Sequence, residues 1–210
     1  MRKTAPVFAF ALFCVCVSAA PIGAQGIQGR ELLGVRIGGV IGSPPLRDAF
    51  GNGSELELHF IKGLGTWWGL GLALSSHNFG ASKDSLANIA YTGMNREVRF
   101  SIFSMTGCFF ARKPIAGRFT ATGEAGLGLY ALTASIPSGF YQGTRTENRF
   151  GTYCGAGMLM RISRGVSFDL NVKYHYVFVG SDELEAIHFF TGETRARFMQ
   201  IAFGVLLFSI

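Results

Sequence analysis

The sequence predicts an all-β protein: an eight-stranded antiparallel up-and-down transmembrane β-barrel preceded by a cleaved signal peptide. First, residues 166–178 alternate strictly between apolar and polar side chains, which is the period of a β-strand. Second, 49% of the 210 residues are hydrophobic and only 15% are charged, yet no segment after the amino terminus reads as a membrane-spanning helix. Such a chain must bury its apolar surface in a core or expose it to lipid as a closed barrel.

The amino terminus has the features of a secretory signal peptide. Two basic residues precede a chargeless apolar run over residues 5–17, and small residues follow. The run is too short to span a membrane. Cleavage after Ala24 is favoured over cleavage after Ala20, because a proline would directly follow the latter bond. We therefore expect residues 1–24 to be removed and residues 25–210 to form one barrel domain.

Three strands are predicted in the first part of the exported chain. The segments 31–41 and 54–62 alternate apolar residues with polar ones, which include Arg36 in the first segment and Glu55, Glu57 and His59 in the second. The segment 67–75 forms the third strand. Alternation with period 2 places the apolar residues of each strand on one face of the sheet and the charged residues on the other.

The fourth predicted strand, 96–110, has a less regular pattern. Phe100 and Ile102 alternate with Arg99 and other polar residues, so we expect the two apolar side chains to face lipid and Arg99 to face the interior. The alternation fails near residues 103–105, where the pattern predicts a β-bulge.

Four more strands complete the set. They cover residues 119–134, 149–161, 166–178 and 195–208. In the fifth strand Glu124 lies opposite Leu127 and Leu129, and in the last strand the alternating residues from 199 to 207 are apolar. The total of eight is the smallest common size for a transmembrane barrel.

The connections between these strands alternate between long and short. The long ones cover residues 42–53, 76–95, 135–148 and 179–194, and the short ones cover 63–66, 111–118 and 162–165. Outer-membrane barrels have long extracellular loops and short periplasmic turns, so both termini are predicted to lie in the periplasm.

Two groups of side chains are expected at the barrel ends. Basic residues gather at the short connections, and we interpret them as solvated groups near lipid head groups rather than as a specific partner site: Lys62, Arg112, Lys113, Arg118, Arg161 and Arg164. Aromatic residues are expected to form girdles. They are Phe60, Trp67, Trp68, Phe109, Phe110, Phe119 and Phe208 at the periplasmic end and Tyr130, Phe150, Tyr174, Tyr176 and Phe178 at the other.

The polar faces of the strands are predicted to line the interior. Their residues are Arg36, Glu55, Glu57, His59, Arg99, Glu124, Asp169, Lys173, His175, Arg197 and Gln200. Side chains fill an eight-stranded barrel, and buried charges must be paired. We therefore expect a charge-paired plug, with Arg36 against Glu55 or Glu57 and Lys173 reaching across. A conducting or proton-relaying lumen is the alternative.

Several motifs in the second half carry a family resemblance. They are GEAGLGLY at 123–130, Phe150-Gly151, Gly155-Ala156-Gly157, the run 168–173 and Tyr174-His175-Tyr176-Val177-Phe178. With them, residues 121–178 resemble the outer-membrane β-barrel domain family of small bacterial surface proteins, although the chain ends Phe208-Ser209-Ile210 rather than on an aromatic residue. The resemblance implies an outer-membrane location and a structural or surface-interaction role. It implies outer-membrane lipids, the barrel-insertion machinery and an extracellular partner of the long loops as partners.

An enzyme is the first alternative function. A lipid A-modifying barrel enzyme, either a deacylase or an acyltransferase, needs a nucleophile and a base near the outer leaflet. Ser75 and His77 are the nearest match, but their order is the reverse of that in barrel deacylases. The sequence therefore predicts no catalytic, cofactor-binding or metal-binding residues, and its basic residues form no nucleic-acid surface.

A soluble exported β-barrel that binds a small apolar ligand is the second alternative. It would require the apolar faces to point inward and Arg36, Glu57, Asp169 and Lys173 to face water.

Two further motifs are given a structural interpretation. Residues 126–131 imitate a dinucleotide-binding fingerprint, but they lie within a strand and no helix follows, so their glycines are expected to relieve crowding in the lumen or to shape the curvature of the strand. Cys108 and Cys154 fall on strands separated by a third strand, about 9–10 Å apart by strand spacing, so a disulfide between them is not expected.

Overall fold

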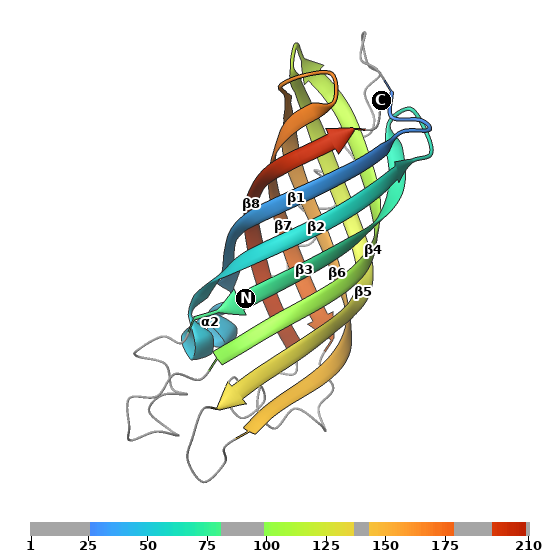
Figure 1. Ribbon diagram of the computed structural model, residues 1–210. Helices are drawn as coiled ribbons and strands as arrows, with labels where there is room; N and C mark the ends of the chain where they lie inside the picture. The colour runs from blue at the N-terminus through green and yellow to red at the C-terminus, as the bar shows by residue number, and fades with distance from the viewer. Residues whose placement is uncertain (1–25, 81–98, 137–142, 179–194, 209–210) are drawn as a thin grey trace, which may run out of the picture.

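The computed structural model describes residues 26–80, 99–136, 143–178 and 195–208, which form a closed antiparallel β-barrel (Figure 1). Its strands are β1 (Glu31–Gly42), β2 (Asn52–Gly63), β3 (Trp68–Phe79), β4 (Arg99–Ala116), β5 (Phe119–Ile136), β6 (Gly143–Arg161), β7 (Val166–Phe178) and β8 (Arg195–Phe208). Each strand pairs with its neighbour in the chain, and β8 pairs with β1 to close the barrel. The predicted eight-stranded barrel is confirmed, and each predicted strand overlaps an observed one. Three strands extend well beyond their predicted bounds: β3 ends at Phe79, β4 ends at Ala116 and β6 begins at Gly143.

The two ends of the barrel differ in their connections. At one end, which we call the turn rim, the short connections 64–67, 117–118 and 162–165 join the strands and residues 26–30 lead into β1. At the other end, the loop rim, a helix joins β1 to β2, and the other strands lead into residues outside the described part of the chain. Figure 1 shows the turn rim at the top and the loop rim below.

Some predicted features lie outside the described residues. They are the signal peptide with its cleavage site, the loops 81–98, 137–142 and 179–194, and the terminal Ser209 and Ile210. Among the described residues, no helix is long and apolar enough to cross a membrane.

Apolar side chains cover the outside of the barrel and charged ones lie inside. Exposed residues include Leu33, Leu56, Leu72, Met105, Leu129, Val172 and Phe203, and Leu72 is 59% exposed. By contrast, Arg36, Glu57, Asp169 and Lys173 are each at most 1% exposed. This is the reverse of what a soluble ligand-binding barrel would need, and it is the arrangement of a transmembrane barrel, whose outer face contacts lipid.

The predicted faces of β4 are wrong. Phe100 and Ile102 point into the barrel and are almost completely buried, whereas Arg99 is exposed on the outside. The strand has no bulge near residues 103–105, because its pairing with β3 and β5 is continuous there, and the register shifts between Pro114 and Ala116 instead. The apparent break in the pattern arises because the interior is itself apolar near the loop rim.

The girdle prediction is confirmed for six of its twelve aromatic residues and is wrong for three. Phe60, Trp68, Phe119, Phe150, Tyr174 and Phe178 are exposed on the outer face. Phe110 and Tyr130 are buried in the interior, and Phe208 is half-buried against interior residues. These three rings pack inside the ends of the barrel rather than against lipid.

The connection 42–53 contains a helix that the sequence pattern did not predict. Helix α2 (Pro44–Phe50) begins with two prolines and ends at Gly51, which has φ of 71° and donates its N–H to the Arg47 carbonyl over 2.6 Å. A positive φ of this size favours glycine. The helix turns Leu46 and Phe50 into the barrel mouth, where both are buried.

Two apolar clusters occupy the two ends of the lumen. The loop-rim cluster consists of Val40, Leu46, Phe50, Phe79, Phe100, Ile102, Tyr130, Leu132, Ala134, Val177, Ala196 and Phe198. The turn-rim cluster consists of Ile27, Leu32, Ile61, Phe110, Leu159 and Leu206, with Phe208 packed against it. Ile27 is held there by its own N–H, which donates to the Thr66 carbonyl over 3.0 Å. The polar interior therefore lies between two apolar layers.

Candidate functional site

Arg36 lies at the centre of a buried charge network. Its Nη1 donates to Glu57 over 2.7 Å, its Nη2 to Glu124 over 2.5 Å, and its Nε to Asp169 over 2.6 Å. A single guanidinium thus contacts three carboxylates, each through a charge-assisted hydrogen bond. We use the term charge network for Arg36, Glu57, Glu124, Asp169 and Lys173.

Lys173 is the second cation of the charge network. Its Nζ lies 2.7 Å from both carboxylate oxygens of Glu57 and 3.0 Å from Glu124 Oε2. It also lies 4.8 Å from the centre of the Tyr153 ring, within the range of a cation–π contact. Two cations therefore face three carboxylates, and every charged member of the network has an opposite charge in contact, as buried charges require.

The barrel register explains these contacts. Arg36 on β1 is directly opposite Glu57 on β2. Arg36 and Asp169 belong to strands that are separated by β8, and the β8 residue opposite both of them is Gly204. Because Gly204 has no side chain, Arg36 can reach across β8 to Asp169.

A second glycine has the same role on the other side of the lumen. Gly155 on β6 is opposite both Glu124 on β5 and Lys173 on β7. A Cβ atom at Gly155 would lie 2.7 Å from Lys173 Cγ, closer than real atoms approach. Gly155 and Gly204 therefore have the same role, because each lets two charged side chains meet across its strand.

A chain of hydrogen bonds extends from the charge network toward the loop rim. Gln200 Nε2 donates to Glu57 over 3.4 Å and also to Glu55, and His175 Nε2 lies 2.8 Å from Gln200 Oε1. Since an amide oxygen can only accept, Nε2 of His175 carries the proton and Nδ1 accepts from the Tyr130 hydroxyl over 3.1 Å. His175 also stacks on Phe198, with 4.5 Å between ring centres. This chain connects the charge network to the loop-rim cluster.

Most of the interior residues predicted from the sequence lie together. Arg36, Glu55, Glu57, His59, Glu124, Asp169, Lys173, His175 and Gln200 are all buried in the lumen. The expected pair of Arg36 with Glu57 and the reach of Lys173 across the barrel are confirmed. Arg99 and Arg197 were wrongly assigned, because the lumenal positions beside them are taken by Phe100 and Phe198. Tyr130 was missed as an interior residue, since its strand neighbours gave no polar signal.

Ser75 and His77 do not form the catalytic arrangement of the enzyme alternative. Both side chains point into the lumen and are at most 3% exposed. Ser75 Oγ donates to Glu57 over 3.2 Å, and His77 packs against His175 and Phe198. A nucleophile for lipid substrates must reach the outer leaflet, whereas these two groups are enclosed by the barrel wall and the loop-rim cluster.

The structure also places Lys62 and the two cysteines that the sequence singled out. Lys62 forms an exposed ion pair with Glu31 over 2.8 Å, so it does not join the other basic residues of the turn rim. Cys108 is buried in the lumen and Cys154 is exposed on the outer face, and both are free thiols. Within the described ranges, no group of three or more His, Cys, Asp and Glu side chains could hold a metal ion.

Solved structures of bacterial outer-membrane proteins share this fold. Neisserial surface protein A (NspA) is 12% identical with a TM-score of 0.59, and the match covers 86% of this chain and 97% of that one. Ail, the attachment invasion locus protein of Yersinia pestis, is 13% identical with a TM-score of 0.53, covering 87% and 99%. A major outer membrane protein from Thermus thermophilus is 11% identical with a TM-score of 0.53, covering 85% and 99%.

These similarities support the fold that the sequence predicts. No family profile and no curated protein sequence matches the chain. The chain is a closed eight-stranded barrel within its described residues, and the structures it resembles are small outer-membrane barrels.

Proposed function

We propose that the protein is an integral outer-membrane β-barrel with a structural or surface-interaction role and a lumen closed by its own side chains. The observation that carries this proposal is the layered interior: the charge network lies between the loop-rim and turn-rim clusters. A hydrated ion would have to displace both apolar layers and break ion pairs between them. No catalysis is part of the proposal, since Ser75 and His77 are enclosed in the lumen.

The outer surface supports insertion into a bilayer. Apolar residues face outward on all eight strands of the described barrel, and the exposed aromatic residues Trp68, Phe119, Phe150 and Phe178 lie toward its ends. Lipids of the outer membrane are therefore the partners of this surface. The proposal places the turn rim in the periplasm and includes residues 1–24 as the export signal.

The surface-interaction role is supported by the neighbours and by the fold. One neighbour is named a surface protein and another an attachment invasion locus protein. Loops that join strands at the loop rim are where an outer-membrane barrel contacts its surroundings. We propose an extracellular partner for these loops and the barrel-insertion machinery as the partner during biogenesis.

Planar-bilayer recording tests the closed lumen. The purified protein is refolded into lipid, and heat-modifiable gel mobility confirms that it is folded before recording. We expect no large, stable openings, because the interior offers no continuous polar path. A conducting porin reconstituted by the same procedure is the positive control. Frequent, large and stable ion-conducting openings of the folded protein would make a pore its leading function.

Membrane fractionation tests the location. We expect the exported protein to sediment with outer membranes and to be released by detergent but not by high salt. Recovery of the folded protein in the soluble periplasmic fraction would contradict the proposal.

A further inference from the structure

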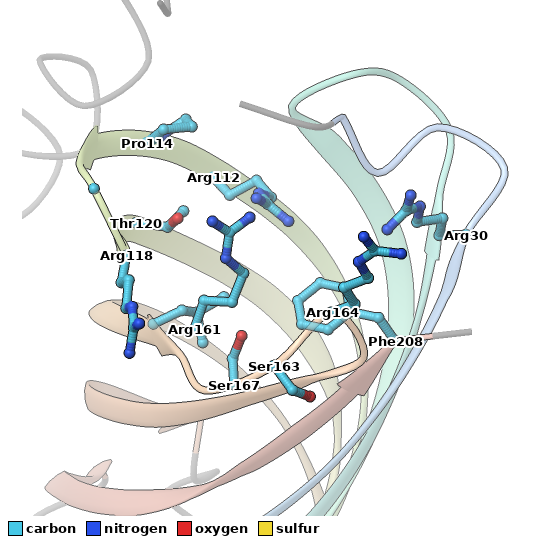
Figure 2. Close-up of a pocket in the computed structure, with 12 residues that line it drawn as sticks. Arg30, Arg112, Pro114, Arg118, Thr120, Arg161, Ser163, Arg164, Ser167 and Phe208 are labelled. Carbon is cyan, nitrogen blue, oxygen red and sulfur yellow. The ribbon is translucent and has the colours of Figure 1, made fainter. Parts of the chain in front are cut away.

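Five arginines from four separate segments surround a pocket at the turn rim. Arg30 precedes β1, Arg112 lies near the end of β4, and Arg118 lies in the β4–β5 turn. Arg161 is the last residue of β6, and Arg164 lies in the turn that follows it. Figure 2 shows these side chains around the hollow, together with the Phe208 ring. The sequence indicated that basic residues gather at this end, but it did not place Arg30 among them.

The arginines of this pocket lack acidic partners. No Asp or Glu lines the pocket, and among the described residues none of its five arginines has a carboxylate within salt-bridge distance. The charged groups that act on the Arg112 guanidinium are Arg30 and Arg161, which carry the same sign. Buried or crowded charges are normally compensated by opposite charges. This cluster differs from the interior, where each cation contacts carboxylates.

Arg112 is held in a defined position within the pocket. Its backbone N–H donates to the Trp67 carbonyl over 2.8 Å, and its guanidinium carbon lies 5.8 Å from the centre of the Phe208 ring. Its Nε is buried and has no hydrogen-bond partner among the described residues. A guanidinium stacked on an aromatic ring in this way keeps its N–H donors directed outward from the ring edge.

The rest of the pocket suits a small tetrahedral anion. Hydroxyl groups of Thr120, Ser163 and Ser167 line it beside the arginines, and the buried Leu159 forms its apolar base. The cavity has a volume of about 60 Å³. Since a cavity needs roughly 10–15 Å³ to hold one water molecule, there is room for a group of several non-hydrogen atoms. Apolar walls strengthen the attraction between the arginines and an anion.

We propose that this turn-rim pocket binds a phosphate group. Arginine is the side chain best matched to phosphate oxygens, because its planar donors bind two oxygens at once. The phosphate can belong to a lipid head group at this membrane surface or to a phosphorylated solute beside it. This proposal goes beyond the structural and surface-interaction role, which concerns the barrel wall and the opposite rim.

Two probes distinguish the sources of the phosphate. Pyrophosphate is titrated into the protein folded in a phosphate-free non-ionic detergent, and binding is followed by calorimetry. In parallel, phosphatidylglycerol is added to the same micelles, and bound lipid is counted by native mass spectrometry. Saturable binding of pyrophosphate alone assigns a solute, and retention of phosphatidylglycerol alone assigns a lipid. Binding of both assigns a site that accepts either source.

The double variant Arg112→Gln with Arg161→Gln tests whether these two arginines bind the phosphate. We expect it to weaken binding of the probe by about tenfold or more, since it removes two sets of charge-assisted hydrogen-bond donors. The control is Arg47→Gln with Arg99→Gln, which removes the same charge at the loop rim and should leave binding unchanged. Heat-modifiable gel mobility verifies folding of both variants.

A charge-preserving variant covers the case in which the glutamine variant does not fold. Replacing Arg112 and Arg161 by lysine keeps the charge but removes the planar donors, and we expect severalfold weaker binding. Equal affinity in the wild type, the turn-rim variants and the loop-rim control would overturn the proposal. Failure of the wild type to bind either probe would overturn it too, and neither result would affect the closed lumen.

Discussion

Replacement of Arg36 by methionine is the sharpest test of the interior. Methionine keeps an unbranched apolar stem, is shorter than arginine and removes all of its donors. Glu57 and Glu124 would still contact Lys173, at 2.7 and 3.0 Å. Asp169 would lose its ion-pair partner, and its Oδ1 is already buried without a hydrogen bond. The substitution therefore leaves one buried carboxylate uncompensated.

The expected loss in the free energy of unfolding follows from this one uncompensated carboxylate. Breaking a buried ion pair by removing one partner typically costs about 3–5 kcal/mol. We expect Arg36→Met to lower the free energy of unfolding by this amount. Lys173→Met should cost less, because Glu57 and Glu124 both keep hydrogen bonds to Arg36.

A double-mutant cycle with Asp169→Asn isolates the pair. In the Arg36→Met background, Asp169→Asn also removes the uncompensated carboxylate. The double variant should therefore lose less stability than the sum of the losses of the two single variants. The coupling should lie near the upper end of the range of about 0.5–3 kcal/mol for residues in contact. Arg36 reaches Asp169 across Gly204, so this coupling also tests the closure of β8 on β1.

Urea titration of folding in lipid vesicles measures these free energies, with the fluorescence of Trp67 and Trp68 as the signal. Val35→Ala is the control, because Val35 is the neighbour of Arg36 on the lipid-facing side of β1. A loss for Arg36→Met within about 1 kcal/mol of the loss for Val35→Ala would refute the reasoning, since a broken buried ion pair costs more. Strict additivity of Arg36→Met and Asp169→Asn would refute the direct contact.

Three further predictions concern the wall of the barrel. Leu170→Arg should destabilise the folded barrel by about 2–4 kcal/mol near the bilayer midplane, and Asn171→Ser should cost much less; equal losses in vesicle titrations would contradict the assignment of faces. Gly204→Ala should cost about 1–3 kcal/mol, because its Cβ would overlap the Val35 carbonyl oxygen. In the same assay Gly107→Ala should be nearly neutral, since the nearest atom is 4.0 Å away, and similar losses for both would refute the crowding at Gly204. Finally, mass spectrometry of the exported protein after alkylation should find Cys108 and Cys154 unlinked to each other, whereas an intramolecular disulfide would contradict the strand register.

The positions of the strands could be predicted because the period-2 pattern is strong in the middle of the barrel. There the outer face meets lipid and the inner face holds charges, so polarity identifies the face of each residue. The segments 166–178 and 195–208 match β7 and β8 at both ends. The pattern thus indicated both the strands and most of the buried polar residues.

Polarity no longer identifies the faces where the interior becomes apolar. Phe100, Phe110 and Tyr130 lie inside the barrel near its ends, so their hydrophobic character gave the wrong face. Helix α2 was missed for a related reason: it is seven residues long, and its buried Leu46 and Phe50 are too few to form a periodic pattern. Both errors arise from the apolar clusters at the two rims.

The contact between Arg36 and Asp169 could not be predicted from adjacent strands. The two residues are 133 positions apart, and β8 lies between their strands. Their contact requires closure of the barrel and a glycine at the intervening register position. Neither condition can be read from alternation within one strand, whereas the pair of Arg36 with Glu57 follows from two consecutive strands.

The arginines of this protein occupy two environments with opposite electrostatic consequences. Arg36 is surrounded by carboxylates of its own chain, so its charge is compensated on folding and stabilises the closed barrel. Arg112 is surrounded by Arg30 and Arg161, so folding brings like charges together. Such self-repulsion opposes the compact state and is relieved by an anion from outside the chain. Removing the charge of Arg36 should therefore weaken the barrel, whereas removing the charge of Arg112 relieves repulsion and weakens anion binding instead.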